Sequence, residues 1–157
     1  MADTRRRHVP ESRIDRLLNR AFGVAVGLGL GFSHNYLLAV RGRKTGMTFT
    51  TPVNLLDYDG RRFLVASRGE TQWVRNARAA GRIALSKGSR RLEFQVRELA
   101  PHLKPPILKA FLDRFATSVQ RFYPIPKGSP VESFEPIANR YPVFELISVA
   151  KSEARKR

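Results

Sequence analysis

A short segment of the sequence gathers basic side chains beside two glycines. Residues 41–54 read RGRKTGMTFTTPVN. The guanidinium of Arg43 and the ammonium of Lys44 can donate charge-assisted hydrogen bonds to phosphate or carboxylate oxygens, and the arginine fork fits two oxygens at once. The stretch is not a nucleotide-binding P-loop, because it lacks the four-residue gap and the glycine-lysine-serine/threonine ending. The segment is therefore predicted to bind an anionic ligand.

Other polar and aromatic residues can complete such a site if the fold brings them to it. They are Thr50, Thr51, Ser67, Arg68, Trp73 and Asn76. A pocket of this kind combines an anion clamp, hydroxyl donors and an aromatic wall, which suits a large planar cofactor with an acidic tail. Asn76 either satisfies buried backbone groups or contacts the ligand. No nucleophile elbow or spaced catalytic histidine accompanies these residues, so the cofactor would carry the chemistry.

The charge of the chain is unusual for its size. A formal net charge of +16, from 29 basic and 13 acidic residues, attracts phosphates, nucleic acid or anionic lipid. No helix-turn-helix, zinc-finger or RNP-type signature is present, so specific nucleic-acid binding is not predicted. The three histidines show no ligand spacing, so no metal site is predicted. The absence of cysteine excludes disulfides and thiol chemistry, and it fits a cytoplasmic protein.

The two ends of the chain are predicted to lie outside the folded domain. Residues 1–10 are expected to be disordered, residues 11–150 to form one domain, and residues 151–157 to form a basic tail. A helix is expected to begin at Ser12, with one apolar face and one arginine-rich face. That helix either covers the edge of a core or rests on an anionic membrane surface. The apolar run 21–32 is well short of the ~20 residues that a membrane-spanning helix needs.

Alternating apolar residues and turn signals predict six strands. They are Tyr36–Arg41, Phe49–Tyr58, Arg62–Ser67, Arg82–Lys87, Arg90–Leu99 and Val143–Val149. The first three are expected to form a meander, with a hairpin at Asp59-Gly60. Pro52 cannot donate to a ladder, so it is expected at a sheet edge or a bulge, where a ligand can approach backbone amides.

Three helices are expected between these strands. Thr71 is the predicted N-cap of a helix through Ala80, which Gly81 ends. An aromatic stripe predicts a long core-packing helix over Ile107–Tyr123, and a short helix is expected over Val131–Arg140. Short hairpins with inserted helices favour an α+β fold built on an antiparallel barrel.

Several motifs, in this order and spacing, resemble one known family. GRKTG stands at 42–46, TTPVN at 50–54, VASRG at 65–69, QWVRNARAAGR at 72–82 and YPVFEL at 141–146. Together they are similar to the deazaflavin-dependent nitroreductase family, whose members are reductases that use coenzyme F-420. The resemblance implies a split β-barrel of the flavin reductase and PNP-oxidase type, with six or so mainly antiparallel strands and inserted helices.

The resemblance also implies roles for individual residues. Arg43 and Lys44 would hold the phosphate and the oligoglutamate tail of the coenzyme. The backbone of the second strand would line the deazaflavin ring at Thr50, Thr51, Pro52, Val53 and Asn54, and Ser67, Arg68, Gly69, Trp73 and Asn76 would complete the cofactor site. Tyr123 would either reach the acceptor or pack in the core. Phe49 stands where many family members carry a further arginine.

The activity implied by this resemblance is hydride transfer from reduced coenzyme F-420 to a small-molecule acceptor. The acceptor would be a quinone, an activated alkene or a nitroaromatic compound. Two alternatives remain open at this point: an FMN-dependent oxidoreductase on the same barrel, and a non-catalytic binding protein for a flavin-like or other anionic ligand. Oligomeric state is not predicted.

Overall fold

A computed structural model of the chain describes residues 34–149. The expectations for residues 1–10, for the helix beginning at Ser12, for the apolar run 21–32 and for the tail 151–157 lie outside the described residues. Among the described residues, no helix is long and apolar enough to cross a membrane.

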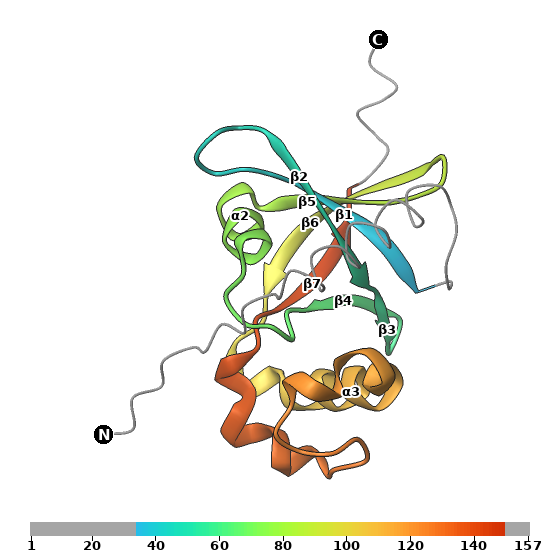
Figure 1. Ribbon diagram of the computed structural model, residues 1–157, viewed down its shortest axis with the longest axis vertical. Coiled ribbons are helices and arrows are strands. Elements are labelled where there is room, and N and C mark those ends of the chain that lie inside the picture. The colour runs from blue at the N-terminus through green and yellow to red at the C-terminus, as the bar shows by residue number, and fades with distance from the viewer. Residues whose placement is uncertain (1–33, 150–157) are drawn as a thin grey trace.

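Seven strands form one curled antiparallel sheet in the described part of the chain (Figure 1). They are β1 (Asn35–Arg41), β2 (Thr48–Asn54), β3 (Leu56–Tyr58), β4 (Arg61–Val65), β5 (Arg82–Lys87), β6 (Arg90–Glu98) and β7 (Val143–Ser148). Their order in the sheet is β2-β1-β5-β6-β7-β4-β3. The edge position predicted from Pro52 is confirmed, because β2 ends this order and Pro52 pairs with Leu37 of β1.

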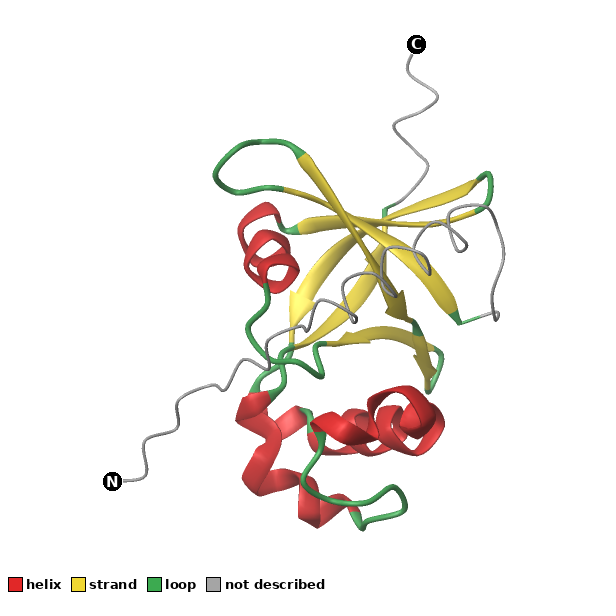
Figure 2. Cartoon of the chain, in the orientation of Figure 1, coloured by secondary structure: helices red, strands yellow, loops and turns green. Residues whose placement is uncertain are grey.

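Helices flank this sheet (Figure 2). The α-helices are α2 (Gln72–Ala80) and α3 (Pro105–Val119), and the 3-10 helices are η1 (Pro101–Leu103), η2 (Gln120–Phe122) and η3 (Val131–Arg140). Gly81 ends α2 in the left-handed conformation, with φ 71°, as predicted. Thr71 occupies the N-cap position, but its hydroxyl makes no capping hydrogen bond. The long helix expected through Tyr123 ends as an α-helix at Val119 and continues as η2.

The predicted second strand is wrong as one continuous strand, although the pairings expected of the meander are confirmed: β1 pairs with β2, and β3 pairs with β4 through the hairpin at Asp59-Gly60. The chain leaves β2 at Asn54 and begins β3 at Leu56, and the two strands lie at opposite ends of the sheet order. Leu55 and Leu56 are consecutive and both buried, at 5% and 2% exposure. Consecutive residues of one strand point to opposite faces, so burying both leucines requires a core on each side of the chain at this point. Leu55 belongs to neither strand, and the two leucines enter different cores.

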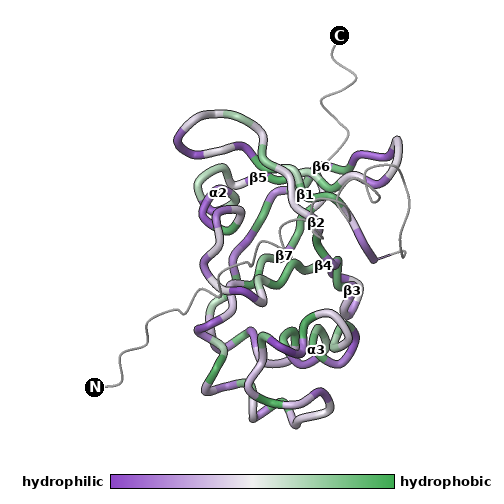
Figure 3. Tube along the Cα trace, viewed as in Figure 1, coloured by the Kyte–Doolittle hydropathy of each residue, from purple (hydrophilic) through white to green (hydrophobic). Residues whose placement is uncertain are grey.

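Two hydrophobic cores lie on either side of β4. Phe63 and Val65 belong to the core that α3 and η3 cover, whereas Leu64 and Ala66 belong to the core inside the curled sheet. This alternation agrees with the pattern in the sequence. Figure 3 shows the hydrophobic strands against the more hydrophilic loop between β1 and β2.

A buried carboxylate ties three neighbouring strands together. Glu145 on β7 has a side chain only 9% exposed, and it accepts hydrogen bonds from Arg61 Nε at 2.8 Å and Arg61 Nη2 at 2.7 Å. It also accepts a short hydrogen bond from Arg97 Nη2. Hydrogen bonds from Arg61, followed by those from Arg97, lower the pKa of Glu145 to about 2. The carboxylate therefore stays ionised and fixes β4 and β6 to β7.

Candidate functional site

A groove of about 1330 Å³ opens between the β2 edge, the β4–α2 loop, α2 and α3. It gathers most of the site residues predicted from the sequence: Arg43, Lys44, Thr50, Thr51, Pro52, Val53, Asn54, Ser67, Arg68, Trp73 and Asn76. Two predicted residues do not line it. Gly69 is buried in the β4–α2 loop, where its φ of 85° suits glycine, and Tyr123 lies behind the groove wall.

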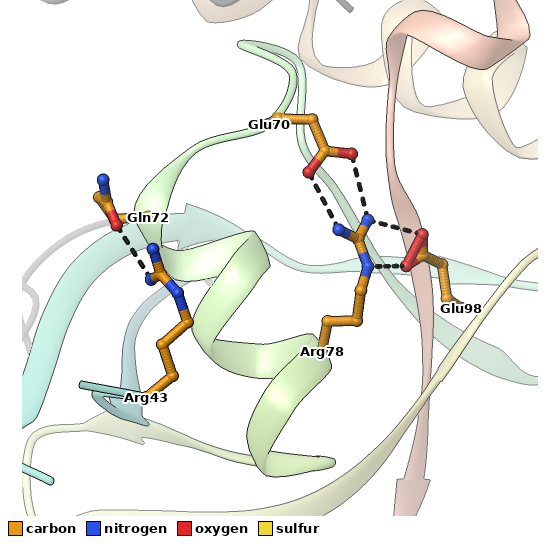
Figure 4. Close-up of polar contacts among 5 residues, drawn as sticks. All are labelled: Arg43, Glu70, Gln72, Arg78 and Glu98. Carbon is orange, nitrogen blue, oxygen red and sulfur yellow. Dashed lines mark hydrogen bonds and ion pairs between the residues drawn. The ribbon is translucent and has the colours of Figure 1, made fainter.

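The β1–β2 loop is fastened to α2 through Arg43. Asn76 Oδ1 accepts hydrogen bonds from the Arg43 backbone N–H at 3.1 Å and from Arg43 Nη1 at 2.8 Å. Arg43 Nη1 also donates to Gln72 Oε1 at 3.0 Å (Figure 4). Asn76 is only 4% exposed, so this asparagine positions the arginine and satisfies a backbone group at once. Gln72 was not predicted to contribute to the site.

The positive charge of this loop is not neutralised by carboxylates. The partners of Arg43 are two neutral amide oxygens, and no ion pair within residues 34–149 includes Arg43 or Lys44. Both side chains are exposed. Charge-assisted hydrogen bonds from them to an anion are therefore available without first breaking an internal ion pair.

The β2 edge forms the long wall of the groove. Among the described strands β2 pairs with β1 alone, so one side of its backbone has no strand partner. Asn54 closes the end of this wall: its Oδ1 accepts a hydrogen bond from Asn35 Nδ2 at 2.7 Å, and its Nδ2 lies 3.4 Å from Ser118 Oγ on α3. A planar ligand lying along β2 would meet backbone groups on one side and α3 on the other.

The β4–α2 loop is held from behind by Tyr123. The Tyr123 hydroxyl lies 3.0 Å from Ser67 Oγ, and the tyrosine ring stacks on Tyr141 with 4.5 Å between centroids. Tyr123 is only 6% exposed. Burial raises the pKa of Tyr123 despite the bond to Ser67, so the phenol stays protonated at neutral pH. Tyr123 thus orients the Ser67 hydroxyl and does not itself face the groove.

Replacing this tyrosine tests the buried hydrogen bond. Tyr123→Phe keeps the stacked ring but removes the partner of Ser67 Oγ, so we expect the free energy of unfolding to fall by about 1 kcal/mol. Urea denaturation followed by circular dichroism measures the change. Tyr58→Phe is the matched control, because Tyr58 is 39% exposed. Equal stability of the two variants would contradict the assigned role of the Tyr123 hydroxyl.

The groove face of α3 was missed by the sequence prediction. Arg114, Phe115 and Ser118 of α3, with Arg121 and Phe122 of the η2 turn that continues it, line the groove opposite β2, although the aromatic stripe predicted core packing alone. The guanidinium of Arg114 lies 5.3 Å from the ring of Phe115, and that of Arg121 lies 4.7 Å from the ring of Phe122. Positions 114, 118 and 121 follow an i, i+4, i+7 spacing, which was the available signal for a polar groove face.

His34 also lines the groove without having been predicted there. Its ring centroid lies 4.8 Å from that of Phe115. Burial, followed by the positive charges of Arg114 and Lys87, lowers the pKa of His34. The imidazole is therefore neutral at pH 7, which leaves it one N–H donor and one acceptor nitrogen.

A charge network anchors the other side of the β4–α2 loop (Figure 4). Arg78 on α2 donates to both oxygens of Glu70, at 3.0 and 3.1 Å, and to both oxygens of Glu98 on β6, at 2.8 Å each. The hydrogen bonds that Arg78 donates to Glu98 and then to Glu70 raise its pKa. Because Glu70 follows Gly69 directly, this network fixes the loop that carries Ser67 and Arg68.

Arg78→Leu should destabilise the protein by about 2 kcal/mol, because two carboxylates lose charge-assisted bonds. The Glu70 side chain is only 11% exposed, so water would solvate its unpaired carboxylate poorly. Guanidinium denaturation measures the effect. Arg75→Leu serves as the control, since Arg75 is exposed on the same helix and belongs to none of the ion pairs of residues 34–149. A loss no larger than that of the control would show that the network is not structural.

The chemistry of the lining fits an anionic, partly aromatic ligand. The described residues that line the groove include no aspartate or glutamate, and residues 34–149 contain no cluster of three or more metal-ligating side chains. Thr71 Oγ1, in the groove wall, is buried without a hydrogen-bond partner. A phosphate- and carboxylate-bearing deazaflavin such as coenzyme F-420 fits this donor set, with Trp73 as an aromatic wall.

The curled antiparallel sheet has the split-barrel fold of the PNP-oxidase type, which the resemblance implied. Residues 11–119 match the family model described as F-420H(2)-dependent quinone reductase. The chain therefore belongs to the F-420H(2)-dependent quinone reductase family, whose members are oxidoreductases.

Solved structures with the same fold share little sequence with this chain. A protein of unknown function from Agrobacterium tumefaciens aligns with a TM-score of 0.55 at 20% identity, over 83% of this chain and 55% of that one. An F-420-H2-dependent reductase aligns with a TM-score of 0.50 at 18% identity, over 73% and 94%. An FAD-binding protein from Mesorhizobium loti aligns with a TM-score of 0.50 at 11% identity, over 83% and 89%. A search of curated proteins finds no match.

Proposed function

We propose that this protein reduces a quinone with the reduced form of coenzyme F-420. The observation that carries the proposal is the groove, which joins the Arg43–Lys44 clamp, the β2 edge and Trp73 without a carboxylate among its described lining residues. Membership of the F-420H(2)-dependent quinone reductase family supports the same cofactor. When bound, reduced coenzyme F-420 supplies a hydride from carbon 5 of its deazaflavin ring to the acceptor.

The anionic tail of the coenzyme would be held at the β1–β2 loop. Asn76 and Gln72 occupy Nη1 of Arg43, which leaves the other donors of this fork for phosphate oxygens. Lys44 adds a second, mobile cation beside it. Because Asn76 also fixes the Arg43 backbone, the clamp is oriented before the ligand arrives.

The ring would lie along the middle of the groove. We assign the backbone of Thr50, Thr51, Pro52, Val53 and Asn54 to one face of the ring, and Ser67, Arg68 and Trp73 to the facing wall. Gly69 would shape the loop alone, because its N–H donates to the Ala66 carbonyl and its own carbonyl accepts from the Thr71 N–H. The unpartnered Thr71 hydroxyl is the further donor that such a ligand would satisfy.

The acceptor would enter beside α3 and η2, where Phe115 and Phe122 give an apolar surface next to the ring position. A quinone suits this surface, and an activated alkene or a nitroaromatic compound has the same planar, electrophilic character. Tyr123 would affect the acceptor only by orienting the Ser67 hydroxyl. The chain's own residues therefore bind, orient and exclude water, and no residue is assigned a covalent step.

One titration series tests the proposal. The purified full chain is titrated with coenzyme F-420, with FMN and with a duplex oligonucleotide. Menadione is then added to the protein with reduced coenzyme F-420, and oxidation of the coenzyme is followed by absorbance. We expect binding of coenzyme F-420 and its oxidation by menadione. Binding of FMN alone, or binding without turnover of any quinone, would overturn the proposal.

A further inference from the structure

The tip of the β1–β2 hairpin exposes two large apolar side chains. Met47 is 65% exposed, more than any other large hydrophobic residue of the described chain, and Phe49 is 48% exposed. In Figure 1 the hairpin extends outward past α2. The Phe49 ring lies against Gly42, where a Cβ atom would come within 2.6 Å of the ring. The tip is therefore a formed apolar projection and not a frayed end.

A small basic pocket lies at the base of the same hairpin. Its volume is about 180 Å³, and its rim carries Arg41 of β1, Thr48 of β2, Arg82 of β5, and Arg91 and Glu93 of β6. The lining includes the buried Ala39 and Ala84. The volume corresponds to about six waters at roughly 30 Å³ each, which is enough for a phosphate group.

The charges around this pocket are mostly uncompensated. Within residues 34–149 neither Arg41 nor Arg82 takes part in an ion pair, and Arg91 approaches Glu93 only at 3.8 Å between two exposed side chains. The pocket lining thus carries three arginines and one glutamate. Among the described residues the pocket shares only Val40 with the groove lining, so it is a site separate from the proposed coenzyme clamp.

We propose that the hairpin tip and this arginine pocket together dock the protein on an anionic phospholipid bilayer. Apolar side chains that enter the interface while arginines hold phosphate groups are the two features of an interfacial anchor. Negatively charged lipids attract such basic surfaces, and the chain carries a net charge of +16. Neither feature alone selects a bilayer, but a phospholipid surface offers phosphate groups and acyl chains side by side.

Docking in this way has a consequence for the groove. Phe49 belongs both to the exposed tip and to the groove lining, so the groove mouth would face the lipid surface. An apolar acceptor dissolved in the bilayer would then reach the groove without crossing water. The docking proposal does not depend on the proposed function, because lipid binding is measured without coenzyme or acceptor.

A single fluorescent label tests the orientation directly. The sequence contains no cysteine, so Met47→Cys provides the only thiol for an environment-sensitive nitrobenzoxadiazole label. Met47 does not line the groove. We expect the fluorescence emission of the label to shift to shorter wavelength on vesicles of phosphatidylglycerol and phosphatidylcholine in equal parts. On vesicles of pure phosphatidylcholine we expect no shift in the emission. Leu103→Cys is the matched control, because Leu103 is 51% exposed on η1.

Charge-matched variants test the pocket by vesicle co-sedimentation. Arg82→Ser with Arg91→Ser should weaken binding to the mixed vesicles about tenfold. Arg75→Ser with Arg140→Ser removes the same charge from exposed residues outside the pocket and should have a much smaller effect. Equal loss in both pairs would indicate attraction by net charge alone. That result would overturn the proposal. An equal blue shift at position 103 would do the same, as would a shift at position 47 that grows with protein concentration in the absence of lipid.

Discussion

Alanine at both Arg43 and Lys44 will weaken the binding of coenzyme F-420 by about 3 kcal/mol, roughly a hundredfold in Kd, because two charge-assisted interactions are lost. The fold will remain intact, since both side chains are exposed. Isothermal titration calorimetry measures the affinity, and thermal denaturation checks the fold. The double variant should also show a weaker dependence of Kd on salt, because fewer charges contact the ligand.

The matched control for this experiment is Arg75→Ala with Lys127→Ala. Both control residues are exposed and lie outside the groove lining, so the pair removes the same net charge without touching the clamp. A control that binds as weakly as the clamp variant would show that the field of the whole protein holds the ligand. Unchanged affinity in the clamp variant would place the anionic tail elsewhere.

Glu145→Gln is expected to lower the free energy of unfolding by about 2 kcal/mol. The glutamine retains the volume, but Arg61 and Arg97 lose the charge that holds them across β7. A fully buried pair would lose 3–5 kcal/mol. The expected loss is smaller because the side chains of Arg61 and Arg97 are 49% and 60% exposed, and water screens them. Urea denaturation at neutral pH measures the change.

The same carboxylate makes stability depend on acid. The pKa of Glu145 is lowered from 4.5 to about 2 in the folded protein, so its contribution is fully present above about pH 4.5 and is lost as the pH falls toward 2. The wild-type protein should therefore lose more stability over this range than Glu145→Gln. Glu93→Gln, at an exposed position of β6, should behave like the wild type. Parallel acid profiles of wild type and Glu145→Gln would contradict the lowered pKa.

Most elements of the fold followed from local patterns. The alternation of Phe63 and Val65 with Leu64 and Ala66, and the glycine stop at Gly81, depend on near neighbours and agree with the structure. The break at Leu55 did not follow, because it depends on two cores that are completed by residues elsewhere in the chain. The sheet order likewise depends on contacts that no local pattern encodes.

The site could be predicted in part for the same reason. The motifs named the residues of the β1–β2 loop, β2 and the β4–α2 loop, which the structure gathers around one groove. The link between Arg43 and Asn76 spans 33 positions, so only a fold could show that the asparagine positions the arginine. The α3 face was missed because Phe115 serves the core and the groove together. The sequence carries no separate pattern for a side chain such as Phe115 that packs in the core and also lines the groove.

Leu55 joins the first and last strands of the sheet order by a single residue, and its N–H donates to the His34 carbonyl at 2.8 Å. The two edge strands β2 and β3 are therefore joined by one residue, and the backbone of this residue is fixed to His34, just before β1. Separating these strands would displace Leu55 and Leu56, each of which packs in a different core. Adaptation to acceptors of different size must then come from α3 or from the β1–β2 hairpin, while the barrel acts as a rigid frame.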